Sequence, residues 1–386
     1  MDKNVLIIID QLEKYVLKEK YKGYDPFDVL NSPIFKFSFL KTNKLIRFGS
    51  QQVFRRIPFN LRPLLGIKKD INPVSLGLCI QSYAYLSIIK PDSKDYYKDN
   101  INIALEKLLS LSSKGYSGYC WGYNFDWEAR YTSIPKYMPT VVATGIITNG
   151  LYEYYKISNN HEIKDILISS SKFVLNDLNR SYEENAFCFS YSPNDRQKVF
   201  NATMKGARLL AQAYSITKDS ELIEVARNTV KYVLNNQRKD GSWFYSKDDA
   251  RKWIDNFHTA YILDALDTFI EISGYEIYKK NLQAGLAYYL NNLFTSEGYP
   301  KYYSDSYYPI DATEVSQSII TLCRFNEFIR ASKVYNFSLK NLYSGNGYFY
   351  YQKKIFPNRI PYLRWSNCWF LLALTYYYTK AHDQKN

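Results

Sequence analysis

The stretch from residue 221 to residue 272 reads ELIEVARNTVKYVLNNQRKDGSWFYSKDDARKWIDNFHTAYILDALDTFIEI and predicts one complete structural repeat. Residues 221–234 carry apolar side chains every three or four positions with charged ones between them, which indicates a helix with one buried face. Residues 259–272 are small or apolar on most faces, which is typical of a helix buried on all sides. Between them stands the aromatic segment 241–245. The repeat is therefore a striped outer helix, an aromatic loop and a buried inner helix.

This order recurs along the chain with a period of about 55 residues, as in repeat architectures. Inner helices are expected at 74–89, 141–157, 202–216, 259–272, 312–325 and 367–378. Outer helices are expected at 95–112, 161–178, 221–234, 276–294 and 325–342, with 4–18 as the sixth. A single helix pair cannot bury its inner face, whereas neighbouring pairs around a ring can. The sequence thus predicts an all-α fold, an (α/α)6 toroid.

The aromatic loops resemble one another and predict short β-hairpin-like segments. They read GYCWGY at 118–123, NAFCFSY at 185–191, GSWFY at 241–245, GYPKYY at 298–303 and GYFYY at 347–351. A Gly or Asn at the exit of an outer helix, followed by alternating aromatic residues, is typical of a turn and a short strand. No linker interrupts the pattern, so we expect residues 1–386 to form one toroidal domain. The proline-rich residues 20–70 are expected to be an irregular segment that packs on the ring.

Composition limits the class of partner. The 386 residues include 39 Tyr, and Tyr suits a half-wet surface because its ring stacks while its hydroxyl hydrogen-bonds. An AT-rich genome would also raise the Tyr content, without a functional cause. The formal net charge of +13 favours an anionic partner. Because the basic residues are scattered and no nucleic-acid-binding motif is present, nucleic acid is not expected.

Cysteines and apolar runs bear on the cellular location. The five cysteines, Cys79, Cys120, Cys188, Cys323 and Cys368, form no CxxC pair and stand in apolar or aromatic stretches, as buried reduced thiols do. We therefore expect a cytoplasmic protein. No apolar run is long enough for a transmembrane segment, and the run at 5–9 is too short for a signal sequence. Peripheral contact with membrane-bound export machinery stays open.

In a toroid, the loops that lead into the inner helices emerge at one end of the ring, so their side chains are expected to meet at the mouth of a central cavity. Aromatic faces stack on sugar rings, and Asp, Asn and Arg side chains bind hydroxyls and carboxylates, so such a mouth is suited to a glycan. The candidate catalytic residues are His258, Asp255, Asp311 and Glu314. The candidate substrate-binding residues are Trp121, Tyr123, Trp127, Arg130, Arg196, Asn201, Trp253, Tyr308, Tyr362, Arg364 and Trp365. No metal-binding or cofactor-binding motif is present, so neither a metal nor a cofactor is expected.

Several of these residues also fit structural roles. Asp311-Ala-Thr-Glu314 matches a helix capping box, and Asp255 stands where an N-cap is expected. His258 could be a hydrogen-bonded structural residue, and the arginines could pair with carboxylates at the rim. A cap and a functional group can coincide, because helix N-termini at a cavity also favour anions.

Six strings of the sequence carry a resemblance to a known family. They are GYDPFD at 23–28, WGYNF at 121–125, VFNAT at 199–203, WIDNFHT at 253–259, YPID at 308–311 and YLRW at 362–365. Together they resemble helical-toroid proteins encoded in extracellular-polysaccharide biosynthesis gene clusters, and this resemblance covers nearly the whole chain. It implies a toroid and a glycan context without naming a reaction. More distantly, the aromatic loops look like the C-terminal domain of glucuronyl C5-epimerases, whose β-rich portion has no counterpart here.

We therefore expect a carbohydrate-active protein of polysaccharide biosynthesis or modification, acting on an anionic, uronate-containing oligosaccharide or polysaccharide or on its lipid-linked precursor. Epimerisation or elimination needs a base that removes the proton next to a carboxylate, and an arginine that stabilises the resulting charge. The base could be His258, Glu314 or a rim tyrosine, and the arginine could be Arg130, Arg196 or Arg364.

Two other functions stay open at this point. Hydrolysis needs two carboxylates across the scissile bond. The candidates for that pair are Asp195, Asp255, Asp311 and Glu128. The alternative of another class is a non-catalytic glycan-binding or assembly protein of a polysaccharide biosynthesis and export system.

Overall fold

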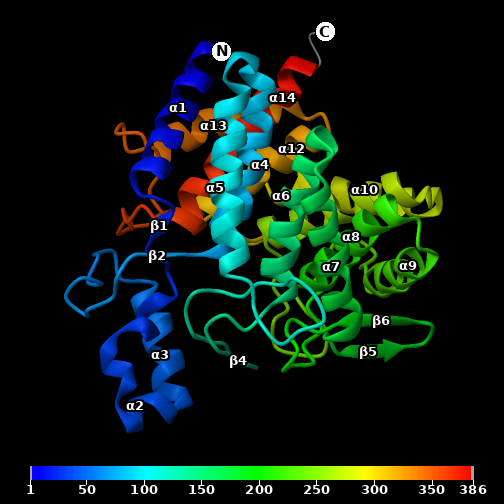
Figure 1. Ribbon diagram of the computed structural model, residues 1–386, viewed down its shortest axis with the longest axis horizontal. Helices are drawn as coiled ribbons and strands as arrows, with labels where there is room; N and C mark the ends of the chain where they lie inside the picture. The colour runs from blue at the N-terminus through cyan, green and yellow to red at the C-terminus, as the bar shows by residue number, and fades with distance from the viewer. Residues whose placement is uncertain (1, 384–386) are drawn as a thin grey trace.

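Six helices form the inner wall of the molecule, whose computed structural model describes residues 2–383 (Figure 1). They are α4 (Pro73–Ile89), α6 (Val141–Ser158), α8 (Phe200–Thr217), α10 (Asn256–Ser273), α12 (Ala312–Arg324) and α14 (Cys368–Asp383). Each packs against the next in sequence order, and α14 packs against α4, so the ring is closed. The predicted (α/α)6 toroid is confirmed.

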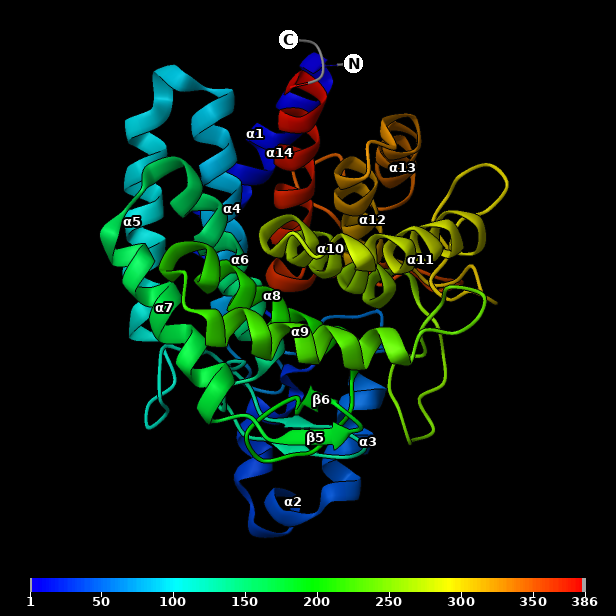
Figure 2. The ribbon, with the colours of Figure 1, turned by 90° about the vertical axis from the view of Figure 1, so that its right-hand side faces the viewer.

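Six outer helices pack against the inner ones. They are α5 (Lys94–Ser110), α7 (His161–Asn176), α9 (Ser220–Asn235), α11 (Lys279–Asn292), α13 (Phe328–Asn341) and α1 (Asp2–Lys18). The first five follow their inner partner in the chain, whereas α1 packs against α14, so the first helix of the chain pairs with the last (Figure 2). The described parts of both termini lie at the end of the ring that is opposite the loops (Figures 1 and 2).

Polar side chains cap four of the six inner helices at the loop end. Asn72, Thr140, Asp255 and Asp311 accept hydrogen bonds from backbone N–H groups in the first turns of α4, α6, α10 and α12. Such caps satisfy N–H groups that have no partner within the helix. The inner helices therefore all begin at the same end of the ring, and the positive ends of their dipoles point there.

The loops at this end form fewer strands than the sequence suggests. One of the aromatic loops contributes to a hairpin whose two strands have four residues each. In it, β5 (Arg180–Glu183) pairs antiparallel with β6 (Ala186–Phe189). The other antiparallel pairs are two residues long: β1 (Lys22–Gly23) with β2 (Asp70–Ile71), β3 (Trp127–Glu128) with β4 (Ser133–Ile134), and β7 (Ile310–Asp311) with β8 (Gln352–Lys353). Three of the four predicted turn glycines adopt the left-handed conformation, with φ of 91° at Gly241, 89° at Gly298 and 85° at Gly347. Gly118 does not.

Residues 24–69, here called the N-terminal arm, project beyond the loop end of the ring (Figure 1). The arm is not irregular throughout, as the sequence had suggested. It contains α2 (Ser38–Thr42) and α3 (Lys44–Phe54), besides the short 3-10 helices η1 (Asp28–Asn31) and η2 (Pro33–Lys36). Gln51 joins the arm to the ring, because its amide donates to the backbone oxygens of Phe27 and Asp126 and accepts from the N–H of Glu128.

Two glycines let α4 and α6 approach closely. A Cβ atom on Gly150 would lie 2.3 Å from the carbonyl oxygen of Gly77 on the facing helix, which is inside van der Waals contact with rigid backbone. We expect Gly150→Ala to lower the free energy of unfolding by about 1–3 kcal/mol, since the helices must separate. Urea-induced unfolding followed by circular dichroism measures the effect.

Gly49 provides the matched control for that variant. It lies within α3, and a Cβ atom there would have nothing within 4 Å. Because Ala is favoured over Gly inside a helix, Gly49→Ala should be neutral or stabilising. Equal losses of stability in the two variants would contradict the proposed close packing of α4 on α6.

Candidate functional site

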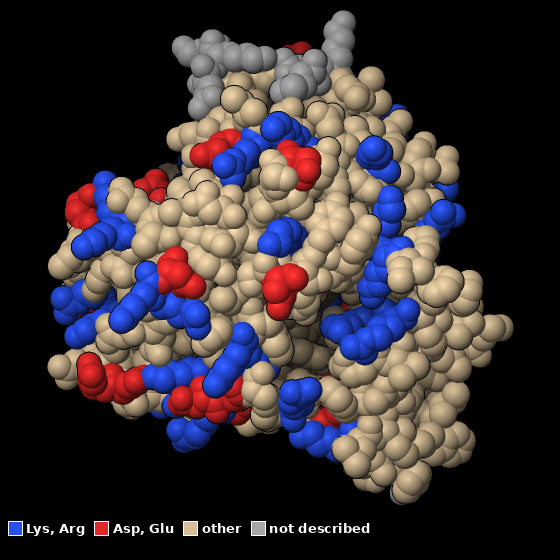
Figure 3. Space-filling model, turned by 180° about the vertical axis from the view of Figure 1, so that it is seen from behind, with Lys and Arg blue, Asp and Glu red and all other residues tan. Residues whose placement is uncertain are grey.

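A cavity of about 350 Å³ opens at the end of the ring where the inner helices begin. Its wall combines the interhelical loops, the first turns of the inner helices and the N-terminal arm, and the surface is hollowed between ring and arm (Figure 3). Among its lining residues are Arg55, Tyr123, Trp127, Arg130, Asn201, Tyr245, Arg251, Trp253, Asp255, His258, Tyr261, Arg364 and Trp365. The predicted convergence of distant loops on one mouth is therefore present.

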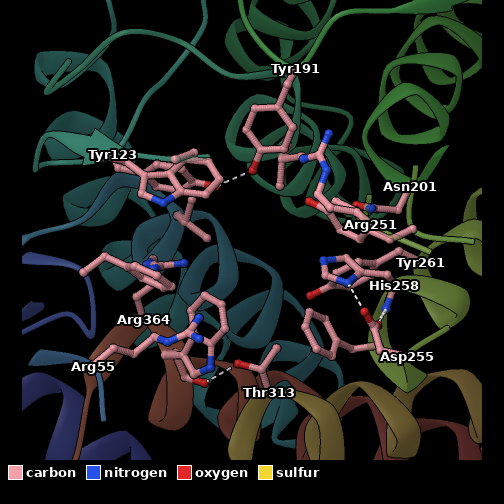
Figure 4. Close-up of a pocket in the computed structure, with 18 of the residues that line it drawn as sticks. Arg55, Tyr123, Tyr191, Asn201, Arg251, Asp255, His258, Tyr261, Thr313 and Arg364 are labelled. Atoms are coloured by element: carbon pink, nitrogen blue, oxygen red, sulfur yellow. Dashed lines mark hydrogen bonds and ion pairs between the residues drawn. The ribbon is translucent and has the colours of Figure 1, made fainter. Parts of the chain in front are cut away.

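His258 and Asp255 form a dyad in the cavity wall (Figure 4). Asp255 Oδ2 lies 2.7 Å from His258 Nδ1, and Asp255 Oδ1 accepts from the backbone N–H of His258 at 2.8 Å. The N-cap of α10 and the partner of the imidazole are thus the same carboxylate. A carboxylate on Nδ1 fixes the tautomer of a neutral imidazole, so that Nε2 carries the lone pair.

Arginines dominate the charge of the cavity. Arg55, Arg130, Arg251 and Arg364 line it, whereas Asp255 is the one Asp or Glu among the lining residues of the described chain. Arg364 lies across the cavity from His258 (Figure 4). An excess of guanidinium groups in a partly enclosed space favours an anionic ligand.

Two of these arginines are held in place by carboxylates outside the cavity lining. The Nε and Nη2 atoms of Arg364 donate to Asp25 at 2.6 and 2.9 Å, and its Nη1 carries no hydrogen bond to a described residue. Arg251 pairs with Asp249, with Nη2 2.6 Å from Oδ2, and its Nη1 donates to Gln197. Arg55 and Arg130 form no ion pair with the described residues, so two cations at the rim stay available to a ligand.

Aromatic side chains form the other walls. The Tyr245 and Trp253 rings stack with their centroids 5.1 Å apart, and the Tyr123 ring stacks on Phe125 at 5.5 Å. Burial raises the pKa of Tyr245 and Tyr261, so both phenols are protonated at neutral pH. These tyrosines can therefore donate hydrogen bonds to a ligand, but they are poor bases.

Six predicted site residues do not line this cavity. Asp311 and Glu314 are fully buried behind it and form the capping box of α12, so the capping interpretation is confirmed for this pair. Asp311 also accepts from Trp365 Nε1 at 3.2 Å, which orients a ring that does line the cavity. Burial and the neighbouring charge of Asp311 raise the pKa of Glu314, because a charged carboxylate is poorly solvated in the core.

Of the other four, two lie in the core and two on the outer surface. Trp121 is buried and donates to the backbone oxygen of Leu108. Tyr362 is buried under the guanidinium of Arg62, whose carbon lies 4.8 Å from the ring centroid. Arg196 and Tyr308 are exposed on the outer surface and are absent from the cavity wall. One side of an aromatic loop faces the cavity and the other faces away from it. The sequence alone does not show on which side a given side chain lies.

The sequence did not point to several lining residues. Phe48, Gln52 and Arg55 come from the helix α3 that was not predicted. Arg251 belongs to a charged stretch, SKDDARK at 246–252, that resembles an ordinary solvated loop. In the sequence, Arg251 stands two residues before Trp253, a predicted site residue. This position could have indicated that Arg251 also lines the cavity. Within residues 2–383, no group of three or more His, Cys, Asp and Glu side chains is placed to hold a metal ion.

Comparison of the whole fold with solved structures identifies its class. A cellobiose 2-epimerase from Bacillus thermoamylovorans aligns with a TM-score of 0.62 at 12% identity, covering 79% of this chain and 87% of that one. A GH76 α-mannanase from Bacteroides thetaiotaomicron aligns with a TM-score of 0.60 at 14% identity, covering 81% and 87%. An unsaturated glucuronyl hydrolase specific for heparin aligns with a TM-score of 0.59 at 12% identity, covering 83% and 89%.

The fold is the (α/α)6 toroid that these structures share. At these identities the likeness shows the fold alone. No protein-family model matches the sequence, and no curated protein matches it significantly. The toroid is therefore shared with sugar epimerases and glycoside hydrolases, while the residues of its cavity must be interpreted from their own geometry.

A second, smaller space of about 40 Å³ lies on the axis of the six-hairpin toroid, on the other side of Tyr261 and Trp369. Residues of all six inner helices line it, including the cations Lys205, Arg208 and Arg324. The Lys205 Nζ atom lies 3.4 Å from the centroid of the Tyr261 ring. Burial and the neighbouring charge of Arg208 lower the pKa of Lys205, because the charged ammonium is poorly solvated there.

Burial of the Lys205 ammonium lowers the free energy of unfolding. We expect Lys205→Met to raise the free energy of unfolding by about 1–2 kcal/mol at neutral pH, because an apolar side chain of similar length replaces a desolvated cation. The folded pKa lies below the unfolded value of about 10.4, so between the two the unfolded chain binds more protons and the stability of the wild type rises with pH. The advantage of the variant should therefore shrink as pH rises in this window, which urea unfolding at several pH values measures. A constant or growing advantage would contradict the assigned burial cost.

Proposed function

We propose that this protein acts on an anionic, uronate-containing glycan and catalyses epimerisation or β-elimination, with His258 as the base that removes the proton next to the carboxylate. The observation that most directly supports this proposal is the His258–Asp255 dyad. It faces a cavity with four arginines and no second carboxylate in its lining. A base and a set of cations are what enolate-forming chemistry requires.

The charge of the cavity supports an anionic substrate. Arg55 and Arg130 have no carboxylate partner among the described residues, and the N-termini of the inner helices point their positive dipole ends to the same place. The aromatic faces of Trp253 and Trp365 suit the apolar faces of sugar rings. A uronate combines both features, since it is a sugar ring with a carboxylate.

The proposed chemistry divides the work among three groups. Nε2 of His258 takes the proton from the carbon that bears the carboxylate, while Asp255 stabilises the imidazolium through Nδ1. Arg364, across the cavity, and the two unpaired arginines stabilise the negative charge that moves onto the carboxylate oxygens. A proton donated to the opposite face by water or by a protonated tyrosine of the wall gives the epimer. In elimination, the C–O bond to the substituent on the next ring carbon breaks and a C=C bond forms. The leaving oxygen takes a proton from the His258 imidazolium or from water, and the product is an unsaturated uronate.

Hydrolysis has less support. Asp195 is buried and accepts from the backbone N–H groups of Tyr191, Ser192 and Gln197 within its own loop. Glu128 is buried and paired with Arg47 at 3.2 Å. Asp311 caps α12, so none of these carboxylates faces Asp255 across the cavity. The paired carboxylates that glycoside hydrolysis uses are therefore missing from the lining.

The same proposal includes the biological role of the protein and its cellular location. The matched structures include enzymes named as a cellobiose 2-epimerase and as a glucuronyl hydrolase specific for heparin, so this type of toroid is used for sugar epimerisation and for an anionic glycan. The sequence strings that resemble toroids of extracellular-polysaccharide gene clusters support a role in polysaccharide biosynthesis or modification. The five cysteines are buried and unpaired, which supports a reducing compartment such as the cytoplasm.

Incubation of the protein with a panel of uronate-containing oligosaccharides in D2O tests the proposal. We expect deuterium at the carbon next to the carboxylate, together with either the epimer or an unsaturated uronate, read by NMR and mass spectrometry. New reducing ends without deuterium uptake would indicate hydrolysis and contradict the proposal. Binding of the oligosaccharides without any exchange would indicate the non-catalytic, glycan-binding alternative.

A further inference from the structure

The N-terminal arm exposes large apolar side chains at the loop end of the ring. Phe37 is 70% exposed, Leu45 82% and Leu64 83%, and Phe39 and Phe59 are exposed to a similar extent. The projecting lobe in Figure 3 is accordingly almost free of charged side chains on the visible face. Large apolar side chains that gather on one surface mark a binding site rather than ordinary solvent contact.

A segment from the other end of the chain extends this surface. The loop KKIFPNR at 353–359 exposes Ile355 and Phe356, which are 93% and 76% exposed. The loop touches the arm, because the Asn358 amide donates to the backbone oxygen of Ile57 at 3.1 Å. Two segments that are about 300 residues apart therefore meet at Ile57 and Asn358, and both expose apolar side chains.

The charge of both segments is predominantly positive. Between Asp28 and Asp70 the sequence holds nine Lys and Arg residues and no Asp or Glu, and the loop 353–359 adds three cations and no acid. Of the cations in the arm, Lys36, Lys41 and Lys44 are exposed and take part in no ion pair of the described residues. Along the sequence from 36 to 45, the exposed apolar side chains thus alternate with unpaired positive charges.

We propose that the N-terminal arm and the loop 353–359 dock this protein on an anionic lipid surface, with the exposed Phe, Leu and Ile side chains at the acyl boundary and the lysines at the headgroups. Apolar side chains combined with Lys and Arg are the features of peripheral membrane segments, and each cation near an anionic leaflet strengthens their binding. A protein partner fits less well, because lysine is depleted in protein interfaces. None of the described helices is long and apolar enough to cross a bilayer, so the contact is peripheral.

The docking surface adjoins the cavity. Helix α3 contributes Phe48, Gln52 and Arg55 to the cavity wall, while Leu45 and Val53 of the same helix are exposed. A protein docked through the arm therefore holds its cavity beside the lipid surface, within reach of a glycan that a membrane carries. The docking itself does not depend on the chemistry of the cavity.

Sedimentation with lipid vesicles tests this inference. Vesicles of phosphatidylcholine with about one third phosphatidylglycerol should carry the wild-type protein into the pellet, whereas vesicles of phosphatidylcholine alone should carry much less. Replacing Phe37, Phe39, Ile355 and Phe356 together by Ser should weaken partitioning by about tenfold or more. Replacing Lys36, Lys41 and Lys44 together by Gln should weaken it similarly and remove most of its dependence on salt.

Matched controls come from the outer helices and their connections. Ile277 and Ile329 are each 78% exposed but lie far from the arm, so Ile277→Ser with Ile329→Ser should leave partitioning unchanged. The same holds for Lys98→Gln with Lys172→Gln on α5 and α7. Wild-type protein that stays in the supernatant with anionic vesicles would overturn the proposal. So would arm variants that partition like the wild type, or arm variants that only convert a self-associated protein to a monomer.

Discussion

Replacing Asp255 by Asn should lower kcat by about 10²- to 10⁴-fold on the glycan that the exchange assay identifies, with little loss of stability. Asn caps a helix about as well as Asp, so the first turn of α10 should persist. The amide cannot stabilise an imidazolium, and its NH2 group favours the wrong tautomer of His258. His258→Ala should cause a loss of similar size, because the base itself is gone.

Asp255→Asn distinguishes the role of the carboxylate as the cap of α10 from its role as the partner of His258. If Asp255 served only as a cap, Asp255→Asn would keep its activity, and that result would contradict the proposed dyad. Asp219 gives the matched control, since it caps α9 through the N–H of Glu221 and has no histidine partner. Asp219→Asn should leave both the turnover and the midpoint of thermal unfolding almost unchanged.

The second large effect concerns stability. Asp25→Asn should lower the free energy of unfolding by about 3–5 kcal/mol, because it leaves the buried guanidinium of Arg364 without a counter-charge. The two side chains are 5% and 8% exposed, so water cannot take over the role of the carboxylate. Burial opposes the charge on Arg364, but the contact with Asp25 more than offsets it and raises the pKa of the guanidinium. Urea-induced unfolding followed by circular dichroism measures the loss.

A double variant tests whether the uncompensated charge is the cause. Asp25→Asn combined with Arg364→Met removes both charges, so it should be more stable than Asp25→Asn alone. A double variant as unstable as the single one would point instead to lost packing. Glu276→Gln breaks the exposed pair with Lys279 and serves as the control, because such surface pairs contribute less than about 1 kcal/mol.

The ring could be predicted because its signals are local. The inner helix α4 buries every residue from Pro73 to Leu86, and the outer helix α9 alternates buried and charged residues over one stretch of sequence. Such periodicities need no knowledge of distant contacts. Helix α3 escaped prediction because Leu45 and Val53 face solvent while Gln51 is buried, which reverses the usual pattern of apolar inside and polar outside.

The cavity could be predicted only in part, since its groups depend on contacts between distant residues. The dyad follows from a spacing of three in the string WIDNFHT, which fits a cap and the first turn of a helix. The pairing of Asp25 with Arg364 joins residues 339 positions apart, and no local pattern indicates it. It does bring together the strings GYDPFD and YLRW, so two of the strings that carried the family resemblance meet in space at the cavity wall.

The pairing of α1 with α14 has a consequence for biosynthesis. The ribosome releases α1 long before α14, so the ring cannot close until α14 has emerged. Until then the apolar inner faces of α4 and α12 lack their common neighbour α14 and stay exposed. A nascent chain of this protein is thus expected to depend on chaperones until α14 has emerged, and loss of α14 should leave an open ring prone to aggregation rather than a smaller folded protein.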